Sequence, residues 1–200
     1  MDIVPSEVER IVPRFTGTIY QVPPMFSALK KDGRRLHDLA REGQNVERDA
    51  RPVDIHDLEI LSVGPGPYPL VTFRVVCGKG TYVRSLADDM AAALGGSAHL
   101  TALHRVRIGS LAAADGLTVD GLAEWKPFLL SPTDALRDLP SVTVGTETAV
   151  GVSHGMRFVG GELMTRKTPG PFRVIDESGQ LIAVYRVDGD QARPEVVLPL

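Results

Sequence analysis

Residues 71–96 read VTFRVVCGKGTYVRSLADDMAAALGG, and this stretch decides the fold class of the chain. The segment from Leu70 to Val76 is rich in β-branched residues, which predicts a central strand. Glycines follow at 78 and 80, and Gly95 and Gly96 end the stretch. Between them, apolar residues recur at the spacing of one helical face, namely Val83, Leu86, Ala87, Met90 and Leu94. A strand, a glycine loop and an amphipathic helix in succession predict an α+β fold.

Shorter elements are expected on both sides of this stretch. A helix is expected over 6–15, opened by the S-x-x-E pattern of a capping box and interrupted by Pro13. Two prolines force an extended segment over 21–26, and a short helix is expected over 35–41. From Pro52 the chain becomes strand-like, and a further strand is expected over 103–108.

The C-terminal part of the chain has a different pattern. After a Gly-, Ala- and Asp-rich stretch over 109–132, short apolar runs alternate with turn signals such as Asp188-Gly189-Asp190. The expected strands are Val142–Val144, Arg157–Val159, Phe172–Ile175, Leu181–Val187 and Val196–Leu198. Short strands at this spacing predict a small barrel or sandwich.

Composition excludes several classes of protein. The chain has 200 residues, of which 43% are hydrophobic and 24% charged, as in globular proteins. No apolar run reaches the length of a membrane-spanning helix, and the N-terminus lacks the pattern of a signal peptide, so a cytoplasmic protein is expected. Cys77 is the single cysteine, and the five histidines lack the spacing of metal ligands, so no metal site is expected.

Charge by itself gives little indication of a nucleic-acid partner. The formal net charge is −3. Residues 1–110 hold 14 Lys and Arg against 13 Asp and Glu, and residues 111–200 hold 8 against 12. Domains that bind RNA are usually more basic than this.

The glycine loop and the start of the following helix form one candidate site. Backbone N–H groups at such a junction can bind an anion, with Lys79 adding charge. Because glycine punctuation is common in turns, the pattern by itself favours a tight turn with an exposed lysine. Arg84 lies in the first helical turn, where a cation opposes the helix dipole. A carboxylate partner would account for that placement, and a solvated arginine is the alternative.

A second candidate lies in the proline-rich segment and the basic residues after it. Phe26 on a stiff extended segment could stack on a planar base, and the alternative is a place in the hydrophobic core. Lys30, Lys31, Arg34 and Arg35 could contact phosphates or belong to a solvated turn.

Taken together, these segments resemble the TruB family of tRNA pseudouridine synthases. The resemblance rests on three blocks in order, which are QVPPMFSALK (21–30) with GRRL (33–36) and LAREG (39–43), CGKGTYVRSL (77–86), and GGSAHLTALHR (95–105). It implies a pseudouridine synthase catalytic domain over 1–115 with a mixed or antiparallel sheet and flanking helices. A linker with a short helix over 116–130 and a PUA-like RNA-binding β-barrel over 131–200 would follow.

The resemblance also implies an activity and its residues. The family isomerises uridine 55 in the tRNA T-loop to pseudouridine without cofactor or metal, after the base is flipped out of its stack. Tyr82 would pack on that base and take part in proton removal, and Arg84 would pair with the catalytic aspartate. Phe26, Lys79 and Leu103 would bind the substrate, and Lys30, Arg34 and Arg35 would contact tRNA, with the protein acting as a monomer.

Two departures from the family pattern affect these expectations. Phe26 stands where the family usually has tyrosine, which keeps the ring and loses the phenol hydroxyl. The family nucleophile is an aspartate in a G-x-L-D-P-x-A-x-G segment before the QVPPMF block, and no such segment occurs among the 200 residues.

Three hypotheses follow from the missing aspartate segment. The chain corresponds to the C-terminal two-thirds of a synthase and is inactive alone; or it is a catalytically inactive protein that binds or folds tRNA; or it is the product of a decaying reading frame that folds poorly.

Overall fold

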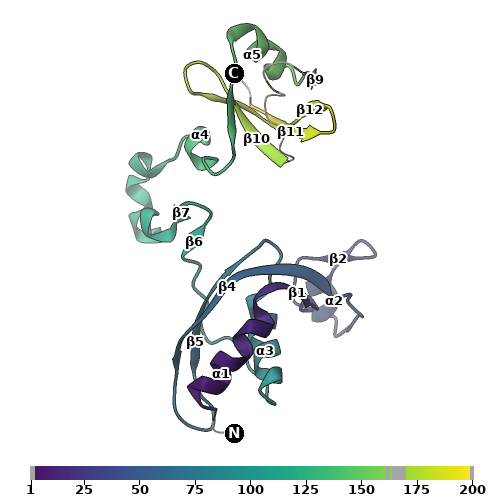
Figure 1. Ribbon diagram of the computed structural model, residues 1–200, viewed down its shortest axis with the longest axis vertical. Coiled ribbons are helices and arrows are strands. Elements are labelled where there is room, and N and C mark those ends of the chain that lie inside the picture. The colour runs from purple at the N-terminus through teal and green to yellow at the C-terminus, as the bar shows by residue number, and fades with distance from the viewer. Residues whose placement is uncertain (1–2, 161–162, 164–169, 199–200) are drawn as a thin grey trace. The chain divides into compact units, whose positions relative to one another are not determined.

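The computed structural model describes residues 3–160, 163 and 170–198. The chain folds as two compact units, Met1–Leu103 and His104–Leu200. The first unit combines helices with a sheet, and the second is built mainly around another sheet (Figure 1). The fold is therefore α+β, as the sequence predicts. The functional assignments of the ranges 1–115, 116–130 and 131–200 stay predictions.

The first unit contains three α-helices and five strands within its described residues. They are α1 (Pro5–Ile11), β1 (Gly17–Gln21), β2 (Lys30–Lys31), β3 (Arg34–Arg35), α2 (Leu36–Arg41), β4 (Arg51–Val63), β5 (Val71–Cys77) and α3 (Val83–Ala93), with a 3₁₀ helix over Val12–Phe15 after α1.

The core of this unit lies between an antiparallel sheet and two helices. The strands β1, β4 and β5 pair in that order, with β4 in the centre. Helices α1 and α3 pack against this sheet (Figure 1). The buried cluster comprises Ile11, Ile55, Leu58, Leu86 and Met90. Burial of these side chains fixes the position of α3, whose first turn carries Arg84.

The central sequence predictions for this unit are confirmed. Helix α3 covers all but the last residue of the expected 83–94, and its Leu86, Ala87 and Met90 are buried as the periodicity requires. The short helix over 35–41 is present as α2, with Leu36 and Leu39 buried.

Two local predictions for residues 1–110 are wrong. Helix α1 begins at Pro5, and the carboxylate of Glu7 accepts from the N–H of Val4, so Ser6 is not its N-cap. The strand expected over 103–108 is reduced to β6 (Arg107–Ile108), because its partner β7 (Leu111–Ala112) has only two residues to pair with it.

Within its described residues, the second unit has a five-stranded sheet in the order β8-β10-β11-β12-β9. Strands β10 and β8 are parallel, and the other pairs are antiparallel. The elements after β7 are α4 (Pro132–Ala135), β8 (Ser141–Thr143), α5 (Thr146–Ser153), β9 (Phe158–Val159), β10 (Gly170–Ile175), β11 (Leu181–Asp188) and β12 (Gln191–Val197), with 3₁₀ helices over Ala113–Asp115, Val119–Glu124 and Lys126–Phe128 before α4.

The five strands expected in the tail are all present, with shifted ends. Strand β12 starts at Gln191, five residues before the expected Val196, because it pairs with β11 from Asp188 onward. Helix α5 was not expected from the sequence, and only Val152 of this helix is fully buried. Tyr185 and Phe172 are the largest side chains of the buried core. A closed barrel stays a prediction.

In the part of the chain that is described, no helix is both long and apolar enough to cross a membrane.

Candidate functional site

The glycine loop after β5 brings the chain into α3 through one tight turn. The Thr81 hydroxyl donates to the carbonyl of Gly78 at 2.9 Å. Gly80 has a φ of +85°, a conformation that residues with a Cβ rarely adopt. Tyr82 is extended, and the helix begins at Val83. The structure therefore confirms the tight turn and places Arg84 in the first helical turn.

The start of α3 is tied to the segment that follows β1. Tyr82 exchanges two hydrogen bonds with the side-chain amide of Gln21, at 3.1 and 3.4 Å. The Arg84 guanidinium donates from Nη2 to the carbonyl oxygen of Phe26 at 2.7 Å. The Ser85 hydroxyl donates to the carbonyl of Val22 at 3.4 Å. These contacts join the QVPPMF and GTYVRS segments, which are about sixty positions apart in the sequence.

The structure places the ring of Phe26 at the surface. Its exposed fraction is 57%, so the explanation that Phe26 belongs to the hydrophobic core is wrong. The backbone around it is held on several sides: Arg48 donates from Nη1 to the carbonyl of Pro23 at 3.2 Å, and His37 Nδ1 lies 3.0 Å from the carbonyl oxygen of Ser27. An exposed aromatic ring on a fixed backbone is suited to stacking on a base.

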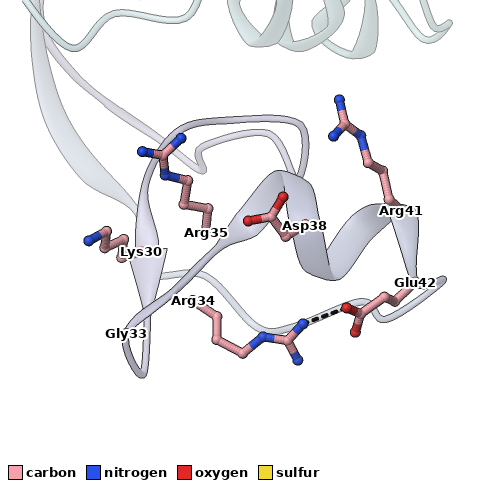
Figure 2. A pocket seen from close by; sticks show the side chains of 7 residues that line it. All are labelled: Lys30, Gly33, Arg34, Arg35, Asp38, Arg41 and Glu42. Atoms are coloured by element: carbon pink, nitrogen blue, oxygen red, sulfur yellow. Dashed lines mark hydrogen bonds and ion pairs between the residues drawn. The ribbon is translucent and has the colours of Figure 1, made fainter.

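The predicted RNA-binding cations lie together on a hairpin and the helix after it. Strands β2 and β3 pair across Asp32 and Gly33, and both of these residues have positive φ, as a two-residue hairpin turn requires. A hollow on this element is lined by Lys30, Gly33, Arg34, Arg35, Asp38, Arg41 and Glu42 (Figure 2). We call these seven residues the basic hollow.

Charges within the basic hollow are partly compensated. Figure 2 shows Arg34 directed toward Glu42, and the two side chains form an ion pair at 2.5 Å. Within the described residues, Lys30, Arg35 and Arg41 form no ion pair. These three cations are therefore available to an anionic ligand, whereas Arg34 is shared with a carboxylate.

The other predicted binding residues lie apart from these contacts. Lys79 is exposed in the glycine loop. Leu103 is 66% exposed at the end of the first unit, and its role as an apolar wall of a base pocket stays a prediction.

Helix α3 carries two carboxylates of its own, Asp88 and Asp89, and neither forms an ion pair with Arg84 among the described residues. Asp88 accepts from the N–H of Ala98 at 3.3 Å, and burial, followed by the charge of Asp88, raises the pKa of Asp89. No ion pair joins Arg84 to a carboxylate in residues 3–160, 163 and 170–198, so its pairing with a catalytic aspartate stays a prediction. Among the same residues, no cluster of three His, Cys, Asp or Glu side chains could hold a metal ion.

Gln21 and Arg41 are among the residues of this site to which the sequence assigns no role. Gln21 is buried at the end of β1 and contacts Tyr82, and nothing in its local pattern indicates that contact. Arg41 lines the basic hollow, and its position three residues after Asp38 on a helix would have placed it there.

Comparison with known proteins decides the family. Residues 1–83 match the sequence profile of the TruB family pseudouridylate synthase N-terminal domain, and residues 139–199 match that of the tRNA pseudouridine synthase II C-terminal domain. The chain belongs to the TruB family. The family prediction is therefore confirmed by matches to both parts of the chain.

Relatives of this TruB family chain are curated as tRNA pseudouridine synthase B. The protein from Symbiobacterium thermophilum is 48% identical over 76% of this chain and 50% of its own length. The protein from Cupriavidus pinatubonensis is 41% identical over 96% of this chain and 64% of its own length. The chain thus spans between half and two-thirds of the length of these relatives.

Solved structures show the same fold. The chain aligns over its full length, with a TM-score of 0.75 and 22% identity, to 64% of a chain in the crystal structure of a Cbf5-Nop10-Gar1 complex. A chain in the structure of an H/ACA RNP bound to a substrate RNA containing 2′-deoxyuridine matches with a TM-score of 0.67 and 20% identity. At these identities the similarity establishes the fold alone.

Proposed function

We propose that this chain forms the base-capturing part of a tRNA pseudouridine synthase that isomerises uridine 55 of the T-loop. The observation that carries the proposal is the hydrogen bond from Arg84 to the carbonyl of Phe26. It ties the bend that bears the exposed Phe26 ring, in which the Ser27 N–H donates to the Met25 carbonyl at 2.9 Å, to the helix start that bears Tyr82. Two aromatic residues of the family pattern thereby lie on segments that are joined by side-chain-to-backbone hydrogen bonds.

The chemistry assigned to these residues follows from the family. Tyr82 packs on the flipped uracil and takes part in proton removal, while Phe26 stacks without contributing a phenol hydroxyl. Base–aromatic stacking contributes about 1–3 kcal/mol per base. Lys79 and Leu103 complete the substrate contacts, with the charge of Lys79 near phosphate.

The nucleophile is an aspartate in the family pattern, and Arg84 has the role of holding that carboxylate ionised and aimed. The Arg84 side chain is exposed, and one of its terminal nitrogens is used by Phe26. A guanidinium has five N–H donors, so several remain for a carboxylate. No cofactor or metal takes part in the proposed reaction.

Substrate binding is assigned to the basic hollow and to the second unit. Lys30 and Arg35 contact phosphates of the T-stem and loop, and Arg34 contributes when Glu42 releases it. We assign residues 131–200 to a PUA-like RNA-binding domain, following the match of residues 139–199 to the family's C-terminal domain. The chain acts in the cytoplasm on one tRNA at a time as a monomer.

Tritium release from T-loop RNA carrying 5-³H-uridine tests the proposal, because formation of the carbon–carbon bond at C5 displaces that label. The 200-residue chain alone should bind the RNA without releasing tritium. A fusion to a segment of a TruB relative that carries the family's G-x-L-D-P-x-A-x-G aspartate should release tritium, and Arg84→Ala in the fusion should abolish release.

The control is a stem-loop of equal length with a scrambled loop, which should bind more weakly. A fusion that is folded by circular dichroism, binds the RNA and releases no tritium would contradict the proposed reaction.

A second function is favoured by one sequence feature, the lack of a G-x-L-D-P-x-A-x-G segment among the 200 residues. Under this alternative the chain is a catalytically inactive tRNA-binding or RNA-folding protein. Binding of T-loop RNA by the chain, with no tritium release by the fusion, would favour it.

A further inference from the structure

Gln21 carries a polar side chain in a fully buried position. It is the last residue of β1, and only 1% of its surface is exposed. A buried primary amide is costly unless its donor and acceptor are both hydrogen-bonded. The location of its partners therefore indicates what the residue does.

Both partners of the Gln21 amide belong to Tyr82. Oε1 accepts from the Tyr82 N–H at 3.1 Å, and Nε2 donates to the Tyr82 carbonyl at a long 3.4 Å. The side chain thus pairs with both backbone polar groups of one residue, as a neighbouring strand would. We call this pair of hydrogen bonds the Gln21 clamp.

Tyr82 is the residue at which the chain changes from extended to helical. Its φ and ψ are −103° and 103°, and no side chain caps α3. Its carbonyl also accepts the first helical bond, from the Leu86 N–H at 2.9 Å. The clamp therefore holds the backbone of the N-cap residue of α3, where the chain enters the helix.

The geometry points to Gln21 as a positioning residue for the Tyr82 ring during base capture. The inference rests on the proposed function, in which that ring packs on the flipped uracil. Side-chain rotamers depend on the backbone angles of their own residue, so fixing the Tyr82 backbone restricts where the ring lies. Without the clamp, the Tyr82 N–H loses its acceptor and the ring samples more directions.

A double-mutant cycle on the 200-residue chain tests this, with a T-loop stem-loop RNA as the probe. Gln21→Ala should weaken RNA binding by about three- to tenfold in the presence of the Tyr82 ring, as the loss of one net hydrogen bond does. In a Tyr82→Ala background the same change should have no effect on affinity. A merely structural role would weaken binding equally in both backgrounds.

The Gln21→Glu variant tests the same inference through the pH dependence of RNA affinity, which should not change if Gln21 only fills space in the core. An ionised carboxyl at position 21 accepts from the Tyr82 N–H and repels the Tyr82 carbonyl, whereas a protonated carboxyl donates and accepts as the amide does. Burial raises the pKa of a carboxyl, so the introduced group should protonate as the pH falls from about 8 to about 5.5. RNA affinity relative to the unmodified chain should rise about three- to tenfold over that range.

Thr72→Glu is the control, because Thr72 is exposed on β5 in the same unit and does not line the basic hollow. It adds the same charge without contacting Tyr82, and its relative affinity should stay constant over the same pH range. This variant separates the effect of an added negative charge on RNA binding from loss of the clamp.

Two outcomes overturn the inference, and each is distinct from failure of the proposed function. Equal effects of Gln21→Ala with and without the Tyr82 ring would assign Gln21 to general packing. A pH-independent Gln21→Glu profile would also overturn it. If Tyr82→Ala binds T-loop RNA as tightly as the unmodified chain, the Tyr82 ring does not contact the RNA. The proposed function is then wrong, and so is the role of Gln21 in positioning that ring. Hydrogen exchange at the Tyr82 amide, slow in the unmodified chain and fast in Gln21→Ala, reports the clamp independently of RNA.

Discussion

Removing the ion-pair partner of Arg34 should strengthen the dependence of RNA binding on salt. Arg34 and Glu42 form an ion pair in the basic hollow, where other cations have no carboxylate partner among the described residues. Glu42→Gln leaves the arginine free to contact a phosphate. The expected result is tighter binding of T-loop RNA at low salt and a steeper fall with rising salt.

The magnitude follows from counterion release. Each phosphate contact contributes about −0.7 for single strands to about −0.9 for duplex to the slope of log K against log salt concentration. Between about 50 and 200 mM salt, a single contact therefore changes affinity by about threefold. Contacts by Lys30 and Arg35 alone would give a slope of about −1.4 to −1.8, and addition of a contact by Arg34 would give about −2.1 to −2.7, a fall of about 20- to 40-fold over that range. Glu42→Gln should make the slope more negative by up to one such contact.

The assay is fluorescence anisotropy of a labelled T-loop stem-loop at several salt concentrations. Glu59→Gln is a matched control, because Glu59 pairs with Arg74 on β5 and its side chain is 48% exposed, as that of Glu42 is. The control removes the same charge from a glutamate–arginine pair outside the basic hollow. Its slope should equal that of the unmodified chain.

The comparison between the two variants decides the outcome. Equal slopes for Glu42→Gln and Glu59→Gln would refute the assignment of Arg34 to RNA contact. A slope that stays unchanged when Arg35→Gln is made would refute the basic hollow as the phosphate-binding surface.

Three further predictions concern stability, measured by thermal unfolding with each transition assigned to a unit by hydrogen exchange. Leu86→Ala, at a fully buried position of α3, should destabilise the first unit by about 2–5 kcal/mol, and an unchanged melting temperature would contradict the described core. Tyr185→Phe removes the hydroxyl that donates to the carbonyl of Met156 at 2.9 Å, so the second unit should lose about 1 kcal/mol and melt a few degrees lower. Hydrogen bonds from Ser178 and Gln180 lower the pKa of Asp176; its stabilising contribution is therefore present above the ordinary carboxyl pKa near 4 and lost as the pH falls through the lowered value. Asp176→Asn should therefore reduce the loss of stability of the second unit as the pH falls below about 4. An unchanged dependence of its melting temperature on pH would contradict a stabilising role of the Asp176 carboxylate.

Local pattern was sufficient to predict much of the first unit. The spacing of Leu86, Ala87 and Met90 predicts α3 because helix periodicity is a property of neighbouring residues. The charge pattern around Gly33 predicts only a turn, although Asp32-Gly33 is also a local signal for the hairpin between β2 and β3. The strand expected over 103–108 failed because a strand needs a partner, and pairing is a long-range property.

The sequence predicts which residues belong to the candidate site, but it does not predict how those residues are arranged in space. Family motifs indicate Phe26, Tyr82 and Arg84, and the exposure of Phe26 could not be inferred, since an aromatic residue beside prolines suits a core equally well. Gln21 stands within the same motif without any local sign of its partner. Its burial depends on how β1 pairs with β4 and where α3 packs on that sheet.

The sequence by itself determined the family, the amphipathic helix α3 and three of the four cations in the basic hollow, Lys30, Arg34 and Arg35. Each of these depends on residue type and short spacing, which the chain carries in any conformation. Only the tertiary structure decided that Gln21 meets Tyr82 across 61 positions and that Arg84 meets Phe26 across 58. Contacts at such separations are set by burial of the shared core, because packing of the sheet against α1 and α3 brings the Gln21 side chain to the Tyr82 backbone and the Arg84 side chain to the Phe26 carbonyl.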